Sequence, residues 1–377
     1  MRKFYAALVL FLLLLPTSFK AESVDNFKVE RTRELNLEGV NGSYYNITAL
    51  DFTTSQSILI NKLYECMSNQ ETSIKYCYTG TDAQMFASYY FFEETFSKVQ
   101  SIDSINNLND GEIIRYYLYT YSWNYFYQDN MVYVDLTIYY RNNRQEVTNT
   151  NNYLRSVVNS LKLDGCSEYV KTVRIYRWIA KKYAYDYTYV DCTDVLAQKK
   201  NKTTCMGYSM ILHKMLEIAR VESLSITGWT EVVNDVGTSD SYHAWNAVKI
   251  EGKWYYCDVC WDEDSNGVDL NYFLRSAYSN QFNTRLVEER IRKNTLAGKP
   301  FSDTSYKIMI KFNSSHVSKS KRIKYITPSY EVKYPKPKRK GYKCLYWYNS
   351  KTKKKVNDTT SFYEPTTLKV KWKRITN

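Results

Sequence analysis

Histidine is scarce in this sequence: His213, His243 and His316 are the three histidines of a 377-residue chain. Chemistry that needs an imidazole is therefore limited to three positions. Long apolar runs are missing after residue 15, which argues against a transmembrane span in the mature chain. We also find no base-reading motif for nucleic acid and no cofactor motif. The one Cys-x-x-Cys, at residues 257–260, lacks a second pair, so a zinc site with His243 is a weak alternative.

Cys205 directly precedes an apolar, helix-like run at residues 206–216. A cysteine at a helix N-terminus is stabilised as the thiolate by the positive end of the helix dipole. Thr203 or Thr204 could cap that helix. Thiol attack on an amide also needs a base beside the thiolate and a group that orients the base.

His243 and Asp258 are predicted to supply these two groups. Residues 241–250 and 253–259 predict two strands around a two-residue turn at residues 251–252. In that register Asp258 faces Trp245 and lies diagonal to His243 on the same face of the hairpin. A three-residue loop would place the two side chains on opposite faces. Taken singly, each residue has an ordinary alternative, such as an inert buried thiol at Cys205.

Three blocks of the sequence resemble the transglutaminase-like superfamily, whose fold is papain-like. They are Cys205-Met206-Gly207-Tyr208-Ser209, His243-Ala244-Trp245-Asn246 and residues 254–262, within a similar region that covers residues 167–276. The resemblance implies that Cys205 is the nucleophile, His243 the base and Asp258 the group that orients it. Cys260 stands where the family commonly has threonine. The backbone N–H of Cys205 is the safest oxyanion donor.

The fold class predicted for the whole chain is α+β. We expect a signal peptide at 1–23, an aromatic-rich α/β lead region at 24–149, the transglutaminase-like domain at 150–295 and a small β-grasp-like module at 306–377. Within these regions the patterns predict helices at 58–67, 82–96, 151–163 and 167–183, and strands at 113–127, 131–140, 223–233, 306–312 and 367–372. Residues 234–241 are expected to form a loop, and residues 280–305 a linker.

The predicted C-terminal module is strongly basic. From residue 306 to the end there are 20 lysines and arginines against 3 acidic residues, a net charge of +17, while the rest of the chain carries −4. Its aromatic and glycine pattern resembles the Listeria–Bacteroides repeat of surface proteins, which implies a binding or spacer role. The charge favours an anionic cell-surface or cell-wall polymer as partner. The alternative is a lysine-rich surface that is merely solvated.

The N-terminus has the pattern of a secretory signal peptide: Arg2 and Lys3 precede an apolar run at residues 4–15. The protein is therefore expected to be secreted or held at the cell surface, where disulfides can form. Without Cys205, seven cysteines remain, an odd number. Cys66–Cys77 and Cys166–Cys192 are candidate local bridges, although connectivity does not follow from sequence.

The sequence as a whole predicts a secreted thiol enzyme that acts on amide bonds of a protein or peptide substrate. Hydrolysis and acyl transfer share the acyl-enzyme step and are not distinguished by the sequence. The alternative is a surface adhesin whose transglutaminase-like domain is catalytically silent.

Overall fold

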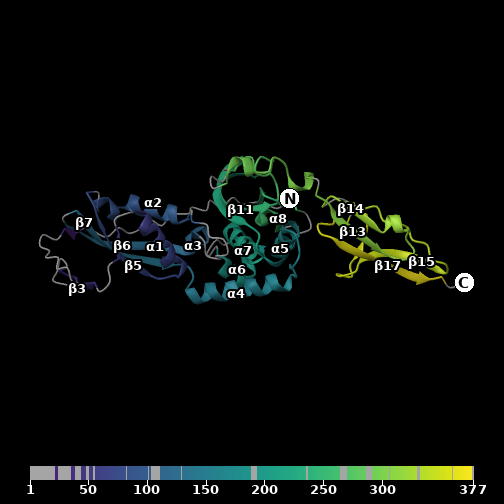
Figure 1. Ribbon diagram of the computed structural model, residues 1–377, viewed down its shortest axis with the longest axis horizontal. Helices are drawn as coiled ribbons and strands as arrows, with labels where there is room; N and C mark the ends of the chain where they lie inside the picture. Colours follow the sequence, from purple (N-terminus) through teal and green to yellow (C-terminus); the bar gives the residue numbers. More distant parts are fainter. Residues whose placement is uncertain are drawn as a thin grey trace.

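The computed structural model describes residues 22–23, 35–38, 44–47, 51–53, 56–81, 83–100, 102, 111–128, 130–187, 193–234, 237–263, 270–285, 291–304, 306–328, 332–358 and 360–375. Sheets of five, three and five strands follow one another along the long axis of the molecule (Figure 1). Apart from residues 22–23, the predicted signal peptide lies outside the described part of the chain. Within that part, no helix combines the length and apolar character needed to cross a membrane.

The lead region is a five-stranded sheet with helices on it. The sheet order is β1-β6-β7-β5-β4, with β1 (Glu22–Ser23), β4 (Asp51–Thr53), β5 (Ser73–Thr79), β6 (Leu118–Gln128) and β7 (Met131–Tyr140). The other elements are α1 (Gln56–Ser68), η1 (Ala83–Ala87), α2 (Tyr89–Gln100) and a separate pair of strands, β2 (Leu35–Glu38) and β3 (Tyr44–Ile47). The predicted helix at 58–67 is confirmed as α1. The predicted helix at 82–96 is interrupted at Ser88, whose hydroxyl accepts a hydrogen bond from the backbone N–H of Phe91.

The predicted strand at 113–127 is wrong in its first part, because α3 (Gly111–Tyr117) precedes β6. Ile114 packs into the aromatic core of the lead region, whereas Ile113 and Tyr117 pack against Met210 and its neighbours in the central region. The segment is therefore buried on two sides as a helix. A short run buried on both sides has no clear periodicity, so the sequence pattern could not distinguish this helix from a strand.

The central region surrounds a three-stranded antiparallel sheet of order β10-β11-β12, formed by β10 (Ser223–Asn234), β11 (Gly237–Ile250) and β12 (Lys253–Cys257). Its helices are α4 (Arg144–Ser160), α5 (Glu168–Lys182), α6 (Asp194–Lys200), α7 (Cys205–Ile218) and the short α8 (Val259–Asp262). A parallel pair, β8 (Ala184–Tyr185) and β9 (Lys202–Thr203), leads into α7. The helix predicted at 151–163 begins earlier, at Arg144, because Asn143 and Glu146 form a capping box.

Both faces of the central sheet are covered. On one face, Val248 packs in the core shared with α5 and α7, and Asn246 donates to the backbone oxygen of Ser209 at 3.0 Å. On the other face, Trp245 packs against Phe282 and other residues of the segment after β12. The prediction of a linker at 280–305 is therefore wrong, since this segment supplies the apolar cover of a sheet face.

The loop predicted at 234–241 is also wrong. Strands β10 and β11 continue as a two-stranded ribbon as far as Asn234, which pairs with Gly237. The backbone hydrogen bonds of the ribbon thus hold this polar segment as strands, although its composition predicts a loop.

The C-terminal region is a five-stranded sheet of order β14-β13-β17-β15-β16. Its strands are β13 (Ile308–Asn313), β14 (Ile323–Ile326), β15 (Tyr342–Asn349), β16 (Lys355–Val356) and β17 (Thr366–Arg374). The strands predicted at 306–312 and 367–372 are confirmed. The segment before β17 contacts α5, where Arg174 pairs with Glu364 and the guanidinium of Arg177 lies 5.2 Å from the ring centre of Tyr363. The resemblance to a surface-protein repeat stays a prediction.

A buried polar cluster around the ion pair of Lys214 and Asp194 joins the lead region to α7. The ammonium of Lys214 lies 2.9 Å from Asp194 Oδ2 and 2.8 Å from Asn151 Oδ1, and neither charged side chain of the pair is exposed. The hydroxyl of Tyr117, from α3, accepts from Lys214 at 2.7 Å and donates to Asp194 Oδ1 at 2.6 Å. One polar cluster thus joins α3, α4, α6 and α7.

The described cysteines are all free, so the predicted disulfides are not formed among them. Cys66 lies in the core between α1 and β5 with Tyr76 and Tyr78. Cys77 stands between these two tyrosines on β5, so its side chain points to the opposite face, away from Cys66. Cys192, the expected partner of Cys166, lies outside the described residues.

Candidate active site

Cys205 is the first residue of α7, as predicted from the sequence. Thr204 is the N-cap residue, but its side chain makes no capping hydrogen bond. Thr203 instead points its hydroxyl at the backbone oxygen of Thr193, 3.5 Å away, so the expected threonine cap is wrong. A Cβ on Gly207 would lie 1.8 Å from this Thr203 hydroxyl, so glycine is required at that position. With no side chain capping the first turn, the positive end of α7 is directed at the thiol and at any anion beside it.

The hairpin of β11 and β12 brings His243 and Asp258 together. Its register is the predicted one: Asn246 pairs with Cys257, and the two-residue turn at Glu251 and Gly252 has positive φ at both residues, 51° and 77°. Strand β12 ends one residue before Asp258. The carboxylate then accepts from the backbone N–H of Trp261 at 3.3 Å and so caps α8. His243 Nε2 lies 2.7 Å from Asp258 Oδ2, and both residues are buried.

Cys205 completes the group, because α7 packs against β11 and the Cys205 thiol is close enough to His243 to raise the pKa of that ring. Since Nε2 of the ring is engaged by Asp258, Nδ1 is the nitrogen left for the thiol. Burial lowers the pKa of His243, but the negative charge of Asp258 and the contact with Cys205 raise that pKa more, to about 9. An imidazolium between a thiol and a carboxylate is the arrangement that activates a cysteine nucleophile.

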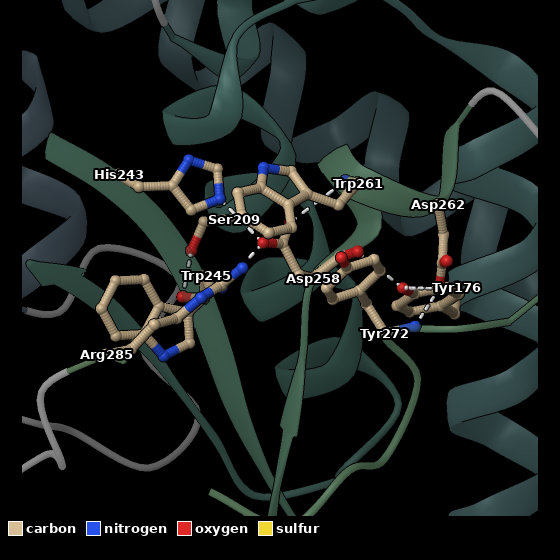
Figure 2. A network of polar contacts seen from close by, with 9 residues as sticks. All are labelled: Tyr176, Ser209, His243, Trp245, Asp258, Trp261, Asp262, Tyr272 and Arg285. Carbon is tan, nitrogen blue, oxygen red and sulfur yellow. Dashed lines mark hydrogen bonds and ion pairs between the residues drawn. The ribbon is translucent and has the colours of Figure 1, made fainter. Parts of the chain in front are cut away.

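Arg285 is a member of the site that the sequence did not reveal. Its guanidinium donates to Asp258 Oδ2 at 2.8 Å, and the same oxygen meets His243 (Figure 2). The guanidinium carbon lies 4.4 Å from the ring centre of Trp261 and 4.3 Å from that of Phe282. Burial raises the pKa of Asp258, but the charges of His243 and Arg285 outweigh burial and hold that pKa below its usual value. Arg285 lies in the segment predicted to be a linker, where no local motif marks it.

A second buried carboxylate, that of Asp262, shares the Tyr176 hydroxyl with the backbone oxygen of Asp258. The hydroxyl of Tyr176, on α5, lies 2.7 Å from the backbone oxygen of Asp258 and 2.6 Å from Asp262 Oδ2 (Figure 2). The Asp262 carboxylate also accepts from the backbone N–H of Tyr272 at 2.9 Å. Burial raises the pKa of Asp262 to about 7, although these hydrogen bonds act in the opposite direction. This network joins α5, α8 and the following segment behind the candidate triad.

Cys257 and Cys260 do not form the alternative zinc site. Cys257 lies in the core toward α5, where its sulfur accepts from the backbone N–H of Leu274 at 3.3 Å. His243 lies on the other face of the sheet and is engaged by Asp258. Burial raises the pKa of both thiols, which makes them poor metal ligands and poor nucleophiles. In the described part of the chain, no group of three or more His, Cys, Asp or Glu residues could hold a metal ion.

Residues 155–259 match the family model of the transglutaminase-like superfamily, and this stretch contains Cys205, His243 and Asp258. The central region of this chain is a transglutaminase-like domain. The match confirms the resemblance predicted from the three sequence blocks and the α+β fold class.

Among curated proteins, kyphoscoliosis peptidase is similar to this chain. The mouse (Mus musculus) protein is 30% identical over 118 residues, and the human (Homo sapiens) protein is 29% identical over 118 residues. Each match covers 29% of this chain and 18% of the relative, so this chain matches under a fifth of either relative's length.

Two solved structures are also similar. One, a candidate cysteine protease from Cytophaga hutchinsonii, has a TM-score of 0.26 and 13% identity, covering 34% of this chain and 52% of the other. The second, a TGase, has a TM-score of 0.27 and 10% identity, covering 56% of this chain and 59% of the other.

Proposed function

We propose that this protein is a thiol enzyme that acts on amide bonds of protein or peptide substrates through Cys205, His243 and Asp258. The observation that carries the proposal is the approach of the Cys205 thiol to His243, together with the contact of His243 Nε2 with Asp258 Oδ2 at 2.7 Å. The name of kyphoscoliosis peptidase, which is similar over the domain, supports a peptide substrate.

The geometry supports the following steps. The thiolate of Cys205 attacks the amide carbonyl carbon, and the resulting oxyanion is placed at the uncapped first turn of α7, where the backbone N–H of Cys205 can donate. The imidazolium of His243 then protonates the leaving amine, and a thioester remains on Cys205. Water or a second amine attacks the thioester, and the now neutral His243 takes the proton from it. The carbon–sulfur bond then breaks, which releases the acid or the new amide and restores the Cys205 thiolate. Asp258 keeps the ring oriented and stabilises its charged form.

The competing hypothesis is an adhesin with a silent catalytic domain. It predicts that Cys205 does not react faster than other accessible thiols. Cys166 is a suitable control, because it is a free, partly exposed thiol that the triad does not contact. We expect an iodoacetamide–alkyne probe to label the wild-type chain and the Cys166→Ala variant at similar rates, and the Cys205→Ala variant far more slowly. Equal labelling of all three would favour the adhesin.

Hydrolysis and acyl transfer can be separated with one substrate mixture. Casein incubated with the enzyme and dansylcadaverine yields unlabelled products if water resolves the thioester, which are fragments after attack on the backbone or deamidated casein after attack on glutamine. It yields fluorescent casein or fluorescent fragments if the amine resolves the thioester. The Cys205→Ala variant should yield neither product. We place this activity outside the cell, on the basis of the signal-peptide pattern at the N-terminus.

A further inference from the structure

The C-terminal sheet has one packed face and one open face. Phe312 and Trp347 are buried on the packed face. The segment 332–338 crosses this face: the ring of Tyr334 lies 6.2 Å from that of Phe312, and the indole N–H of Trp347 donates to the backbone oxygen of Pro335 at 2.9 Å. Side chains alternate along the strands, and a bulge in β15 between Cys344 and Tyr346 shifts the alternation there by one residue, so that Lys343 faces the same side as Lys373. The residues between the core positions therefore point to the open face.

Lysine dominates the open face. Strand β17 places Lys369, Lys371 and Lys373 at alternate positions, about 7 Å apart, and all three are exposed. Lys343 on β15 lies directly opposite Lys373. The register adds one exposed lysine from β13 and one from β16. We call this set the lysine face: Lys311, Lys343, Lys355, Lys369, Lys371 and Lys373.

The lysine face has no internal counter-charge. The five strands of the sheet contain no aspartate or glutamate. Among the described residues, no ion pair includes a lysine of this face. Like charges directly opposite on neighbouring strands, as at Lys343 and Lys373, destabilise a sheet. A polyanion bound across the strands would remove this repulsion, so the charge pattern is complementary to an extended anionic ligand.

The residue types favour a sugar polymer over nucleic acid. The face contains lysines but no arginine, whose planar fork suits phosphate and nucleic acid recognition. Its tyrosines are poor platforms for bases: the ammonium of Lys355 lies 5.4 Å from the ring centre of Tyr346, and Tyr348 meets that ring edge-on at 6.5 Å. Stacking of bases needs open ring faces.

A membrane surface is also less well matched. The exposed apolar side chains of the sheet are few: Ile323 and Tyr325 belong to β14 at its edge, Leu345 stands at the bulge of β15, and β17 contributes none. We propose that the lysine face binds an anionic polysaccharide. This inference does not depend on the proposed enzymatic activity.

The test uses the full chain with the Cys205→Ala substitution, so that turnover cannot affect the result. The face variant carries Lys369→Gln, Lys371→Gln and Lys373→Gln. The control variant carries Lys333→Gln, Lys336→Gln and Lys338→Gln, which removes the same charge from exposed positions on the segment that covers the packed face. Circular dichroism and thermal unfolding establish that both variants remain folded.

Binding is measured to polygalacturonate and to heparin as anionic sugar polymers. We expect the face variant to bind at least roughly tenfold more weakly at physiological salt, and the control variant to change less than about threefold. Binding should also fall steeply toward 1 M salt, because the screening length shortens from about 8 Å to about 3 Å. Equal losses in both variants, or no binding to either polymer, would overturn the proposal.

Two further binding measurements test nucleic acid and an anionic membrane as ligands. A single-stranded oligodeoxynucleotide and phosphatidylserine vesicles are measured with the same three proteins. Tighter, face-dependent binding to either one than to both polysaccharides would show that the lysine face serves that ligand instead. Weaker binding to both supports the polysaccharide.

Discussion

The candidate triad and the lysine face use charge in opposite ways. Around the triad, His243, Asp258 and the neighbouring Arg285 are buried, and one oxygen of Asp258 meets both cationic side chains. On the lysine face, six exposed ammonium groups meet no carboxylate among the described ion pairs. Buried charges are little screened by salt and are expensive to leave unpaired, so each one fixes a geometry. Exposed charges act together, at longer range, and only weakly one by one.

The largest expected effect comes from neutralising Asp258, the acidic member of the triad. Asp258→Asn retains a side chain that caps α8, because asparagine is as good an N-cap residue as aspartate. It removes the charge that orients His243, and we expect kcat to fall roughly 10³- to 10⁴-fold. The measurement is the rate of casein cleavage or amine incorporation. Asp164→Asn, at an exposed position, is the control and should leave the rate unchanged. A loss below tenfold in Asp258→Asn would mean that Asp258 does not orient the base.

Substitutions of Arg285 test its contribution to stability separately from its effect on the pKa of His243. Arg285→Met leaves Asp258 with one cationic partner in a buried site, and we expect the free energy of unfolding to fall by about 3–5 kcal/mol. Without the guanidinium, Asp258 acts on His243 alone, so the pKa of His243 and the basic limb of the pH–rate profile should move upward. The titratable groups near Asp258 and Arg285 also include Cys205, Cys260, Asp262, Tyr176 and Tyr272.

Arg285→Lys is the matched variant. It retains the positive charge but loses the flat group packed on Trp261 and Phe282. We expect it to lose stability while keeping the basic limb close to that of the wild type. A purely structural role for Arg285 would leave the basic limb in the same place in both variants.

The buried pair of Lys214 and Asp194 should give a similar loss of stability without a direct effect on chemistry. Lys214→Met leaves the Asp194 carboxylate buried without its cation, and we expect a loss of about 3–5 kcal/mol in denaturant unfolding. The double variant Lys214→Met, Asp194→Leu removes both charges and should recover part of the loss. If the double variant is as unstable as the single variant, packing rather than charge accounts for the loss.

Local patterns predicted the elements that carry the triad. The start of α7 at Cys205 and the two-residue turn before β12 follow from short-range rules, and the turn fixes the faces of His243 and Asp258. Arg285 and the cover supplied by Phe282 could not be predicted in this way. Their segment contains glycine and proline and has few regular elements, so its role depends on tertiary contacts. The same limit explains α3, which is buried between two regions and so shows no one-sided apolar pattern.

The smallest expected effect is the pH dependence of stability that His243 contributes. The pKa of His243 is about 9 in the folded chain, against 6.5 ordinarily, so the folded state holds the proton more tightly. Its contribution to stability is complete below pH 6.5 and is lost as the pH rises through about 9. The buried Asp262 has a pKa of about 7, and burial raises the pKa of the thiols of Cys66, Cys77, Cys257 and Cys260, which add their own slope as the pH approaches 9. The contribution of His243 is therefore the part of the slope that is lost when His243 is replaced. One proton limits that slope to about 1.4 kcal/mol per pH unit. Denaturant unfolding between pH 7 and 9 should show this slope, and His243→Gln should remove it.

Because His243 and Asp258 are buried, the pH range over which stability falls should stay in place when salt is raised, whereas binding by the lysine face should weaken. If this pH range depends on salt as strongly as polysaccharide binding does, the charges of the triad and those of the lysine face are equally open to solvent.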